Sequence, residues 1–230
     1  MILAGIQKNS FIDYPGKISC VLFITGCNFT CPYCHNADLA RGEFPNRIEL
    51  AEVIAFLKSR KGMLDGVTIT GGEPTLDSGL FELCRTVKAL GYALKLDTNG
   101  SRPDVLDRLL DQRLLDYVAM DIKSPVDSYS HFSRSRDMAS TLMGSIHSIM
   151  ALAPDYEFRT TCAAPYVSAE AIKAIAKTIR GAASYVLQPF NHRTECLDPK
   201  FNRHRALIGI EDLQRLKSLA EPYVKRCTIR

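Results

Sequence analysis

Short apolar segments alternate with amphipathic ones along most of the chain. Strands buried in a parallel sheet are rich in apolar and β-branched residues. Segments of this kind are Ser19–Ile24, Gly66–Thr70, Ala93–Asp97, Tyr117–Ile122, Tyr156–Thr161 and Ser184–Gln188. A closing strand is expected within Tyr223–Ile229. The pattern predicts a sheet whose strands are separated by longer crossover segments.

Helical periodicity fills the intervals between these strands. Leu50, Val53, Ile54 and Leu57 recur at i, i+3, i+4 and i+7, which is one face of a helix. Asn46 followed by Glu49 resembles a capping box that starts this helix. The other expected helices are Ser78–Leu90 with Gly91 to end it, Pro103–Leu110, Ser140–Met150, one with Ile172, Ile175, Ala176 and Ile179 on its apolar face, and Ile210–Ala220.

This alternation predicts an α/β fold with parallel strands, right-handed crossovers and outer helices. A chain of 230 residues without repeats or an interdomain linker fits one domain, residues 1–230. Ligands of such folds collect at the carboxyl ends of the strands. The polar motifs described below each follow directly after a predicted strand, so we expect them to meet at one edge of the sheet.

Composition narrows the class of protein. The net charge of +4 is too weak by itself to indicate a nucleic-acid partner. Apolar runs of membrane-spanning length are missing, and the N-terminus lacks the features of a secretory signal, so we expect a cytoplasmic protein. A disulfide framework is not expected in a long, core-rich chain of this kind. Ordinary packing roles are expected for the scattered cysteines Cys20, Cys84, Cys162, Cys196 and Cys227, although Cys196 lies in a polar loop.

Three further cysteines lie together after the first predicted strand. Cys27, Cys31 and Cys34 have the spacing C-x3-C-x2-C. Iron–sulfur clusters of four irons are usually held by four cysteines, so three thiolates leave one iron open for a small molecule. A structural zinc site with His35 as the fourth ligand is the alternative, although adjacent residues would struggle to reach one tetrahedral ion. Tyr33, between the last two cysteines, is either a packing residue or a cover for a nucleotide.

Two glycine-containing motifs follow the second and third strands. Gly71 and Gly72 let the backbone approach a ligand closely or take positive φ, and Glu73 could accept a hydrogen bond from an ammonium group. The segment Asp97-Thr98-Asn99-Gly100 places a carboxylate where a ribose, a cation or an ammonium group could meet it. Each motif alone is also compatible with a plain turn.

Charged and amide side chains follow the fourth and sixth strands. Asp121 and Lys123 share one face because strand residues alternate. Asp97 and Asp121, at adjacent strand ends, would repel unless a metal ion or Lys123 lies between them. Gln188 and Asn191 either hold a ligand or face solvent. The basic stretch 193–205 is expected to be a solvated face or a docking surface for a partner.

Together these motifs resemble the radical S-adenosylmethionine (SAM) superfamily. Its pattern is C-x3-C-x2-C after the first strand, Gly-Gly-Glu after the second, and a polar ribose-contact motif later. The resemblance implies a partial (βα)6 TIM-type barrel with a [4Fe-4S] cluster at its mouth. Its open iron would chelate the amino and carboxylate groups of SAM, and one electron would cleave SAM to methionine and a 5′-deoxyadenosyl radical.

A narrower resemblance rests on Asp13-Tyr14-Pro15-Gly16-Lys17, on the residues that flank the cysteines, and on the two Asp-containing motifs. These look like glycyl-radical-enzyme activases, most of all the activating proteins of anaerobic ribonucleoside-triphosphate reductase. The implied partners are that reductase and a reducing flavodoxin or ferredoxin. Two alternatives are a radical SAM enzyme for a small molecule, similar to 7-carboxy-7-deazaguanine synthase, and a zinc-binding interaction module.

The resemblance also assigns roles to residues. Cys27, Cys31 and Cys34 would ligate the cluster, and Tyr33 and the backbone near His35 would contact adenine. The contacts to the remainder of SAM would come from Gly71, Gly72, Glu73, Asp97, Asn99, Asp121 and Lys123. A monovalent cation would be held by Asp97, Thr98, the Ala119 backbone and Asp121.

This chain departs from the related pyruvate formate-lyase activating enzyme at one contact. That relative has a SAM-contacting histidine after the last strand, whereas Asn191 stands here with His192 next to it. Gln188, Asn191 or His192 could therefore make this contact. The stretch between Asn36 and Asn46 carries no cysteines, which excludes a second cluster there.

Overall fold

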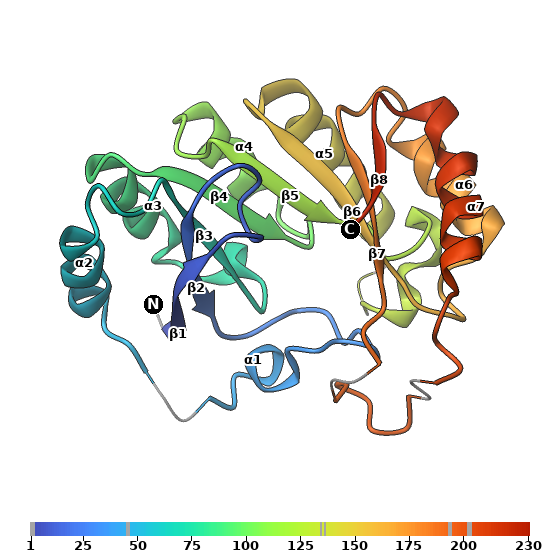
Figure 1. The fold of residues 1–230 in the computed structure, drawn as a ribbon, viewed down its shortest axis with the longest axis horizontal. Coiled ribbons are helices and arrows are strands. Elements are labelled where there is room, and N and C mark those ends of the chain that lie inside the picture. Colours follow the sequence, from blue (N-terminus) through green and yellow to red (C-terminus); the bar gives the residue numbers. More distant parts are fainter. Residues whose placement is uncertain (1–2, 45–46, 134, 136, 193–194, 202–203) are drawn as a thin grey trace.

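The computed structural model describes residues 3–44, 47–133, 135, 137–192, 195–201 and 204–230. Its centre is one sheet in which the strands follow each other in chain order (Figure 1). The strands are β1 (Leu3–Ser10), β2 (Ser19–Ile24), β3 (Gly66–Gly71), β4 (Ala93–Thr98), β5 (Tyr117–Asp121), β6 (Tyr156–Cys162), β7 (Tyr185–Pro189) and β8 (Cys227–Ile229).

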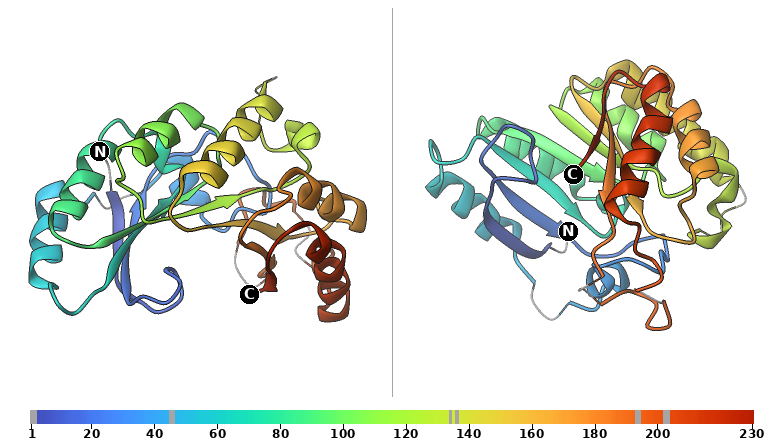
Figure 2. Two further views of the ribbon diagram at one scale, coloured as in Figure 1. Left: turned by 90° about the horizontal axis from the view of Figure 1, so that it is seen from above. Right: turned by 45° about the vertical axis from the view of Figure 1, so that its right-hand side comes forward.

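The α-helices α2 (Leu50–Ser59), α3 (Leu80–Ala89), α4 (Pro103–Asp111), α5 (Met138–Leu152), α6 (Ala169–Thr178) and α7 (Ile210–Ala220) cover the outer face of this curved sheet (Figure 2). The short helix α1 (Ala37–Arg41) lies instead at the carboxyl ends of the strands. Short 3-10 turns lie at Pro74–Leu76, Val126–His131 and Glu221–Tyr223. In the described part of the chain, no helix is long and apolar enough to cross a membrane.

Strand pairing confirms the predicted fold class and adds one strand to it. β2 to β8 pair in parallel, whereas β1 pairs antiparallel with β2. The sheet curls into a partial barrel (Figure 1). β1 and β8 lie at the two ends of the strand order, so the open side of the barrel lies between them. The sequence did not predict β1, because its residues Gln7, Lys8 and Asn9 are polar and exposed.

Two other details differ from the prediction. Glu49 is the N-cap of α2, and its backbone N–H donates to Glu52 Oε1 at 3.3 Å, so Glu49 is not the third helical residue. The predicted cap Asn46 lies outside the described residues. The closing strand is shorter than predicted and starts at Cys227, because Tyr223 belongs to a 3-10 turn.

The two faces of the sheet differ in chemistry. Side chains that point outward, such as Leu22, Ile69 and Val118, are buried beneath the helices in the main apolar core. Side chains that point into the barrel include the buried Lys95 and Glu157, which alternate along their strands with outward residues such as Leu96 and Phe158. The barrel interior is therefore polar, and its charges require partners within the protein.

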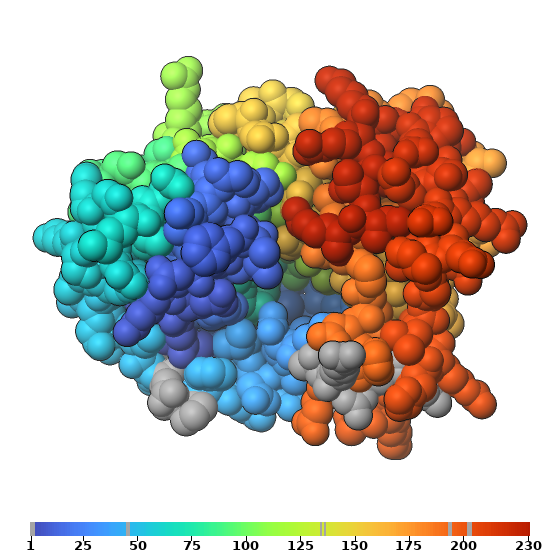
Figure 3. Space-filling model, in the orientation of Figure 1, coloured from blue at the N-terminus to red at the C-terminus, as the bar shows by residue number. Residues whose placement is uncertain are grey.

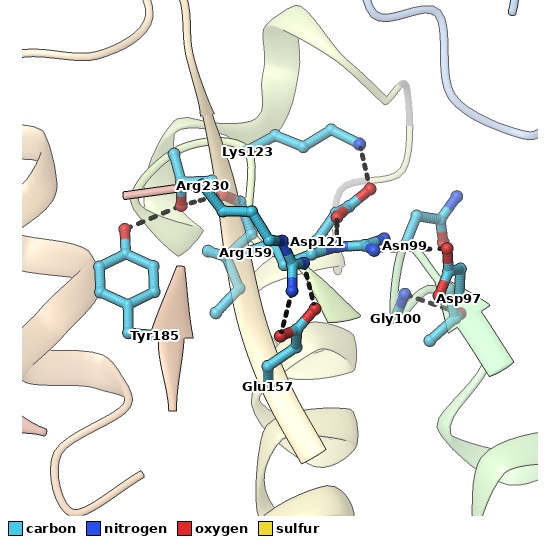
Figure 4. Close-up of polar contacts among 12 residues, drawn as sticks. Asp97, Asn99, Gly100, Asp121, Lys123, Glu157, Arg159, Tyr185 and Arg230 are labelled. Atoms are coloured by element: carbon cyan, nitrogen blue, oxygen red, sulfur yellow. Dashed lines mark hydrogen bonds and ion pairs between the residues drawn. The ribbon is translucent and has the colours of Figure 1, made fainter. Parts of the chain in front are cut away.

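Arg230 supplies the partner for Glu157 (Figure 4). The guanidinium donates from Nη2 to Glu157 Oε1 at 2.6 Å and from Nη1 to Oε2 at 3.1 Å. Tyr117 donates its hydroxyl to Glu157 Oε2 at 3.1 Å. The side chain of Glu157 is 3% exposed and that of Arg230 is 41% exposed, so the pair links the barrel interior to the residue that follows β8.

We predict that Arg230→Ala lowers the free energy of unfolding by about 1–3 kcal/mol, because it leaves a buried carboxylate with one neutral donor. Urea unfolding at pH 7 measures the change. Arg226→Ala is the matched control, since the one hydrogen bond of the Arg226 side chain among the described residues is a 3.4 Å contact with the Ser184 hydroxyl. Equal stability of the two variants would contradict a structural role for the Glu157–Arg230 pair.

Candidate active site

A cavity of about 260 Å³ lies at the carboxyl ends of the strands. It brings together motifs that are far apart in the sequence. The predicted site residues that line it are Cys27, Cys31, Tyr33, Cys34, His35, Gly71, Gly72, Asp97, Thr98, Asn99, Asp121, Lys123 and Gln188. Glu73, Ala119, Asn191 and His192 are not among its lining residues.

The cysteine loop is fixed on two sides by backbone hydrogen bonds. On the inner side, Gly26 N donates to Leu39 O at 2.7 Å and Cys27 N donates to Ala40 O at 3.1 Å, which ties the loop to α1. On the outer side, Leu197 N donates to Cys34 O at 3.0 Å. This second attachment was not predicted, because it joins residues that are far apart in the chain.

The three cysteines fit a cluster better than a single ion. All three are free thiols at one cavity. Burial raises the pKa of Cys31 to about 12 and also raises that of Cys27, so without metal these thiols hold their protons. Among the described residues, no three Cys, His, Asp or Glu side chains converge closely enough to hold one metal ion. An iron–sulfur cube binds its thiolates at separate corners, so this arrangement suits a cube better than a single zinc ion.

Tyr33 and His35 form an aromatic wall of the cavity. The Tyr33 ring lies 5.6–6.2 Å from the rings of Phe132, Tyr166 and Phe201, and the His35 ring stacks on Phe190 at 5.1 Å. Within the described residues, the Tyr33 hydroxyl and His35 Nε2 are buried without hydrogen-bond partners. Buried polar atoms without partners are rare, so a bound molecule with complementary polar groups fits this wall. Burial lowers the pKa of His35, which keeps the imidazole neutral at pH 7.

Gly71 and Gly72 permit close contact between two backbone segments. Gly71 has a φ of +124°, and a Cβ on Gly72 would lie 1.9 Å from the carbonyl oxygen of Gly26. Gly72 N donates to Ile24 O at 2.8 Å, and Glu73 N donates to Gly26 O at 2.7 Å. The glycines therefore seat the segment after β3 directly against the start of the cysteine loop.

Glu73 does not line the cavity, but it connects the segment after β3 to the Asp97–Gly100 segment after β4. Its Oε1 accepts hydrogen bonds from Thr98 Oγ1 at 2.7 Å and from both Thr75 donors, and its Oε2 accepts one from Asn99 N at 2.6 Å. Burial raises the pKa of Glu73, while these hydrogen bonds oppose the rise. The predicted contact between Glu73 and an ammonium group stays a prediction, and the observed role is to position Thr98 and Asn99.

Arg159 lies between Asp97 and Asp121 (Figure 4). Its Nε donates to Asp121 Oδ1 at 2.8 Å and its Nη1 lies 3.3 Å from Asp97 Oδ2. Lys95 pairs with the other oxygen of Asp97, and Lys123 Nζ lies 3.4 Å from Asp121 Oδ2. Each carboxylate oxygen therefore already has a cationic partner within the protein.

The monovalent cation expected at Asp97, Thr98, Ala119 and Asp121 stays a prediction. The positive charge between the two carboxylates is the guanidinium of Arg159, which the sequence analysis missed. Thr98 Oγ1 is also engaged, since it donates to Glu73 and accepts from Gly100 N at 3.1 Å. A signal for Arg159 was present, because strand alternation puts it in the barrel two residues after the inward-facing Glu157.

The same charges set the protonation of Asp121. Burial opposes ionisation, but the charges of Arg159 and Lys123 outweigh it and hold the pKa of Asp121 at about 2. Burial likewise opposes the charge on Lys123, whereas Asp121 raises the pKa of Lys123 well above its ordinary value. Asp121 is therefore an anion and Lys123 a cation throughout the physiological range.

Gln188, Asn191 and His192, the three residues predicted as possible contacts for SAM, lie in different positions. Gln188 lines the cavity. Asn191 provides a backbone hydrogen bond to His35, and the His192 ring lies 6.0 Å from that of His204. The placement favours Gln188 for a contact with a ligand in the cavity. Arg193 and Arg203 of the basic stretch lie outside the described residues.

Comparison with known proteins identifies the family. The family model described as the radical SAM superfamily matches residues 21–159. A protein of Methanocaldococcus jannaschii, provisionally named as a glycyl-radical enzyme activating enzyme, is 34% identical over 100% of this chain and 95% of its own length. The pyruvate formate-lyase-activating enzyme of Staphylococcus epidermidis is 30% identical over 56% of this chain and 55% of its own.

A solved structure shares the fold. SuiB of Streptococcus suis, bound to the precursor peptide SuiA, superposes with a TM-score of 0.69 at 15% identity and covers 91% of this chain and 48% of SuiB. The chain thus belongs to the radical SAM superfamily and is a radical SAM enzyme. Members of this superfamily use a [4Fe-4S] cluster and SAM, and the three free thiols and the two unpartnered polar atoms at the cavity fit these groups.

We predict that Gly72→Ala displaces the cysteine loop, because the added methyl group would overlap the Gly26 carbonyl. The expected cost is about 2 kcal/mol in the free energy of unfolding, together with less iron bound after anaerobic reconstitution. Gly144→Ala is the matched control, since its nearest atom, Pro103 Cβ, would be 3.4 Å away. A Gly72→Ala protein that equals the wild type in stability and iron content would refute the role of this contact.

We predict that Arg159→Met destabilises the fold by about 3 kcal/mol at pH 7, because two partly buried carboxylates lose their shared partner. The folded pKa of Asp121, about 2, lies below its ordinary 3.8, so its stabilising contribution is complete above about pH 4 and is lost toward pH 2. Without the guanidinium, only Lys123 still opposes the effect of burial, so the pKa of Asp121 rises above its wild-type value and its ionised form stabilises the fold less.

The stability difference between wild type and Arg159→Met should therefore shrink as the pH falls from 7 to 4. Urea unfolding across this range measures it. Arg159→Lys should recover part of the loss, since an ammonium group reaches one carboxylate but not both. A difference that stays constant over this pH range would contradict the charge argument.

Proposed function

We propose that this enzyme is a glycyl-radical-enzyme activase, whose substrate is a glycine residue of a partner protein. The cluster held by Cys27, Cys31 and Cys34 would pass one electron to SAM, yielding methionine and a 5′-deoxyadenosyl radical that takes a hydrogen atom from the glycine Cα. The products would be 5′-deoxyadenosine and a glycyl radical. The observation that carries the proposal is the cavity at which three free thiols meet the charged ends of β4, β5 and β6.

The residues around the cavity suit the parts of SAM. The polar aromatic wall of Tyr33 and His35 offers a surface for adenine. Asp121 and Lys123 offer one fixed charge of each sign for the polar groups of the nucleotide and the amino acid. Arg159 would hold both carboxylates in place, so that they keep their orientation while SAM binds and leaves.

The open side of the barrel supports a macromolecular substrate. Figure 3 shows a hollow bordered by the dark blue N-terminal strands, the light blue segment after them and the orange and red C-terminal segments. The turn between β1 and β2, which lies at the opposite end of β2 from the cysteine loop, exposes 75% of Phe11 and 80% of Ile12. Exposed apolar residues of this size suit contact with another protein. A glycine on a flexible segment of the partner could enter the hollow without a further substrate-binding domain.

The particular partner follows from the narrower resemblance. We propose an anaerobic ribonucleotide reductase as the glycyl radical enzyme, and a reduced flavodoxin or ferredoxin as the source of the electron. A cytoplasmic location would give access to both. The alternative, a radical SAM enzyme for a small molecule, predicts 5′-deoxyadenosine formation that depends on that molecule and no radical on a partner protein.

We predict that Cys31→Ala abolishes reductive SAM cleavage, because the cluster loses a ligand. Anaerobically reconstituted protein is reduced with SAM present and assayed for 5′-deoxyadenosine. A candidate reductase is then added, and electron spin resonance detects the glycyl radical. Cys84→Ala is the control, since Cys84 is buried beneath the sheet in α3 and lies outside the cavity.

Full activity of Cys31→Ala would overturn the ligand assignment. Reductive cleavage of SAM by the wild type without a radical on any glycyl radical enzyme would overturn the activase proposal and favour the small-molecule alternative.

A further inference from the structure

The three cysteine sulfurs have unequal hydrogen-bond environments. Cys27 Sγ accepts a hydrogen bond from Phe29 N at 3.4 Å and a second from the side-chain amide of Asn99, with Nδ2 at 3.8 Å. Among the described residues, no hydrogen bond reaches Cys31 Sγ or Cys34 Sγ. Within the described part of the chain, Cys27 is therefore the one thiol of the three whose sulfur accepts hydrogen bonds from N–H groups.

The orientation of the Asn99 amide is fixed by its other contacts. Ser101 N donates to Asn99 Oδ1 at 2.9 Å, which assigns the oxygen end of the amide. The opposite end, Nδ2, then carries two hydrogens, one of which is donated to Asn28 Oδ1 at 3.0 Å. The remaining hydrogen is directed at Cys27 Sγ. If the amide were flipped, its oxygen would face two other acceptors, Cys27 Sγ and Asn28 Oδ1. Its NH2 group would then face another donor, the backbone N–H of Ser101, so the flipped orientation is unfavourable.

Neighbouring residues hold both partners of this amide in place. Asn28 Nδ2 donates to Ser101 Oγ at 2.9 Å, so Asn28 is itself fixed. The backbone N–H of Asn99 donates to the buried Glu73 carboxylate at 2.6 Å. Asn99 is 5% exposed, so water does not compete strongly for its N–H groups. The donor is pre-organised before any metal binds.

We infer that Asn99 donates a hydrogen bond to the sulfur of the Cys27 ligand, and that this hydrogen bond raises the reduction potential of the iron–sulfur cluster. Reduction adds one negative charge, which spreads onto the thiolate sulfurs. An N–H group aimed at one of those sulfurs stabilises the reduced state more than the oxidised state. This inference rests on the proposed ligation of the cluster by Cys27.

The inference extends the role of Asn99 beyond a contact with SAM. An electron donor must reduce the cluster before SAM can be cleaved, and a higher potential makes that transfer more favourable. The motif after β4 would thus act on the electron-transfer step through Cys27, in addition to lining the cavity. Asn99 is a positioning residue in this role, because it acts through the ligand and not on the substrate.

The test is the midpoint potential of the reconstituted cluster in the absence of SAM, followed by electron spin resonance at controlled potentials. Asn99→Ala and Asn99→Leu both remove the donor without adding charge, and the leucine keeps a similar volume if the alanine variant assembles its cluster poorly. Ser101→Ala is the matched control, because it alters the same network while leaving the Asn99 amide and the Ser101 N–H in place. The midpoint potential should become more negative in both Asn99 variants and stay at the wild-type value in Ser101→Ala.

Iron and sulfide contents, measured on the same samples, distinguish a failure of the hydrogen-bond inference from a failure of the cluster to assemble. Intact clusters with wild-type potentials in both Asn99 variants would overturn the inference and leave the proposed function standing. An equal shift in Ser101→Ala would overturn it as well, since the effect would then belong to the network and not to the donor. A wild-type chain that holds no cluster would overturn the proposed ligation, and the inference with it.

Discussion

The backbone contact between the segment after β3 and the start of the cysteine loop determines how the site is built. Gly72 lies so close to the Gly26 carbonyl that no side chain fits between them, and Glu73 N donates to that same carbonyl. The Glu73 carboxylate then binds Thr98 and the backbone of Asn99. Glu73 thereby joins the loops that follow β2, β3 and β4. The positions of the cysteine loop and of Asn99 both depend on this residue.

Charge compensation inside the barrel is the second requirement. A polar interior cannot remain unpaired, and here Lys95, Arg159 and Lys123 alternate with Asp97 and Asp121 so that each charge has an opposite neighbour. The consequence is a cavity whose polar groups are held rigidly before a ligand arrives. Such pre-organisation suits chemistry on a reactive intermediate, because the binding groups need not rearrange around it.

Much of this architecture could be predicted from the sequence. The strand pattern indicated the parallel sheet, and the rule that ligands collect at strand ends brought together Cys27, Gly72, Asp97 and Asp121, which the structure places at one cavity. These predictions succeeded because short apolar segments and their flanking motifs are local signals. The cluster-type spacing of the cysteines was likewise readable without any tertiary information.

The missed features depend on contacts between distant residues. Arg159 was overlooked because a single arginine in a strand gives no sign of which carboxylates it will meet. β1 was missed because half of an edge strand faces solvent and lacks an apolar pattern. The attachment of Leu197 to Cys34 and the hydrogen bond from Asn99 to Cys27 each join residues that only the fold brings together.

The proposed function requires that three cysteines leave one iron of the cluster open for SAM at this cavity. The electron spin resonance spectrum of the reduced, reconstituted protein, recorded with and without SAM, tests this requirement. Binding of SAM to the open iron should change the spectrum of the cluster, and this change should be lost on replacing a cavity residue such as Lys123. Identical spectra with and without SAM, from a protein with full iron and sulfide content, would contradict the account.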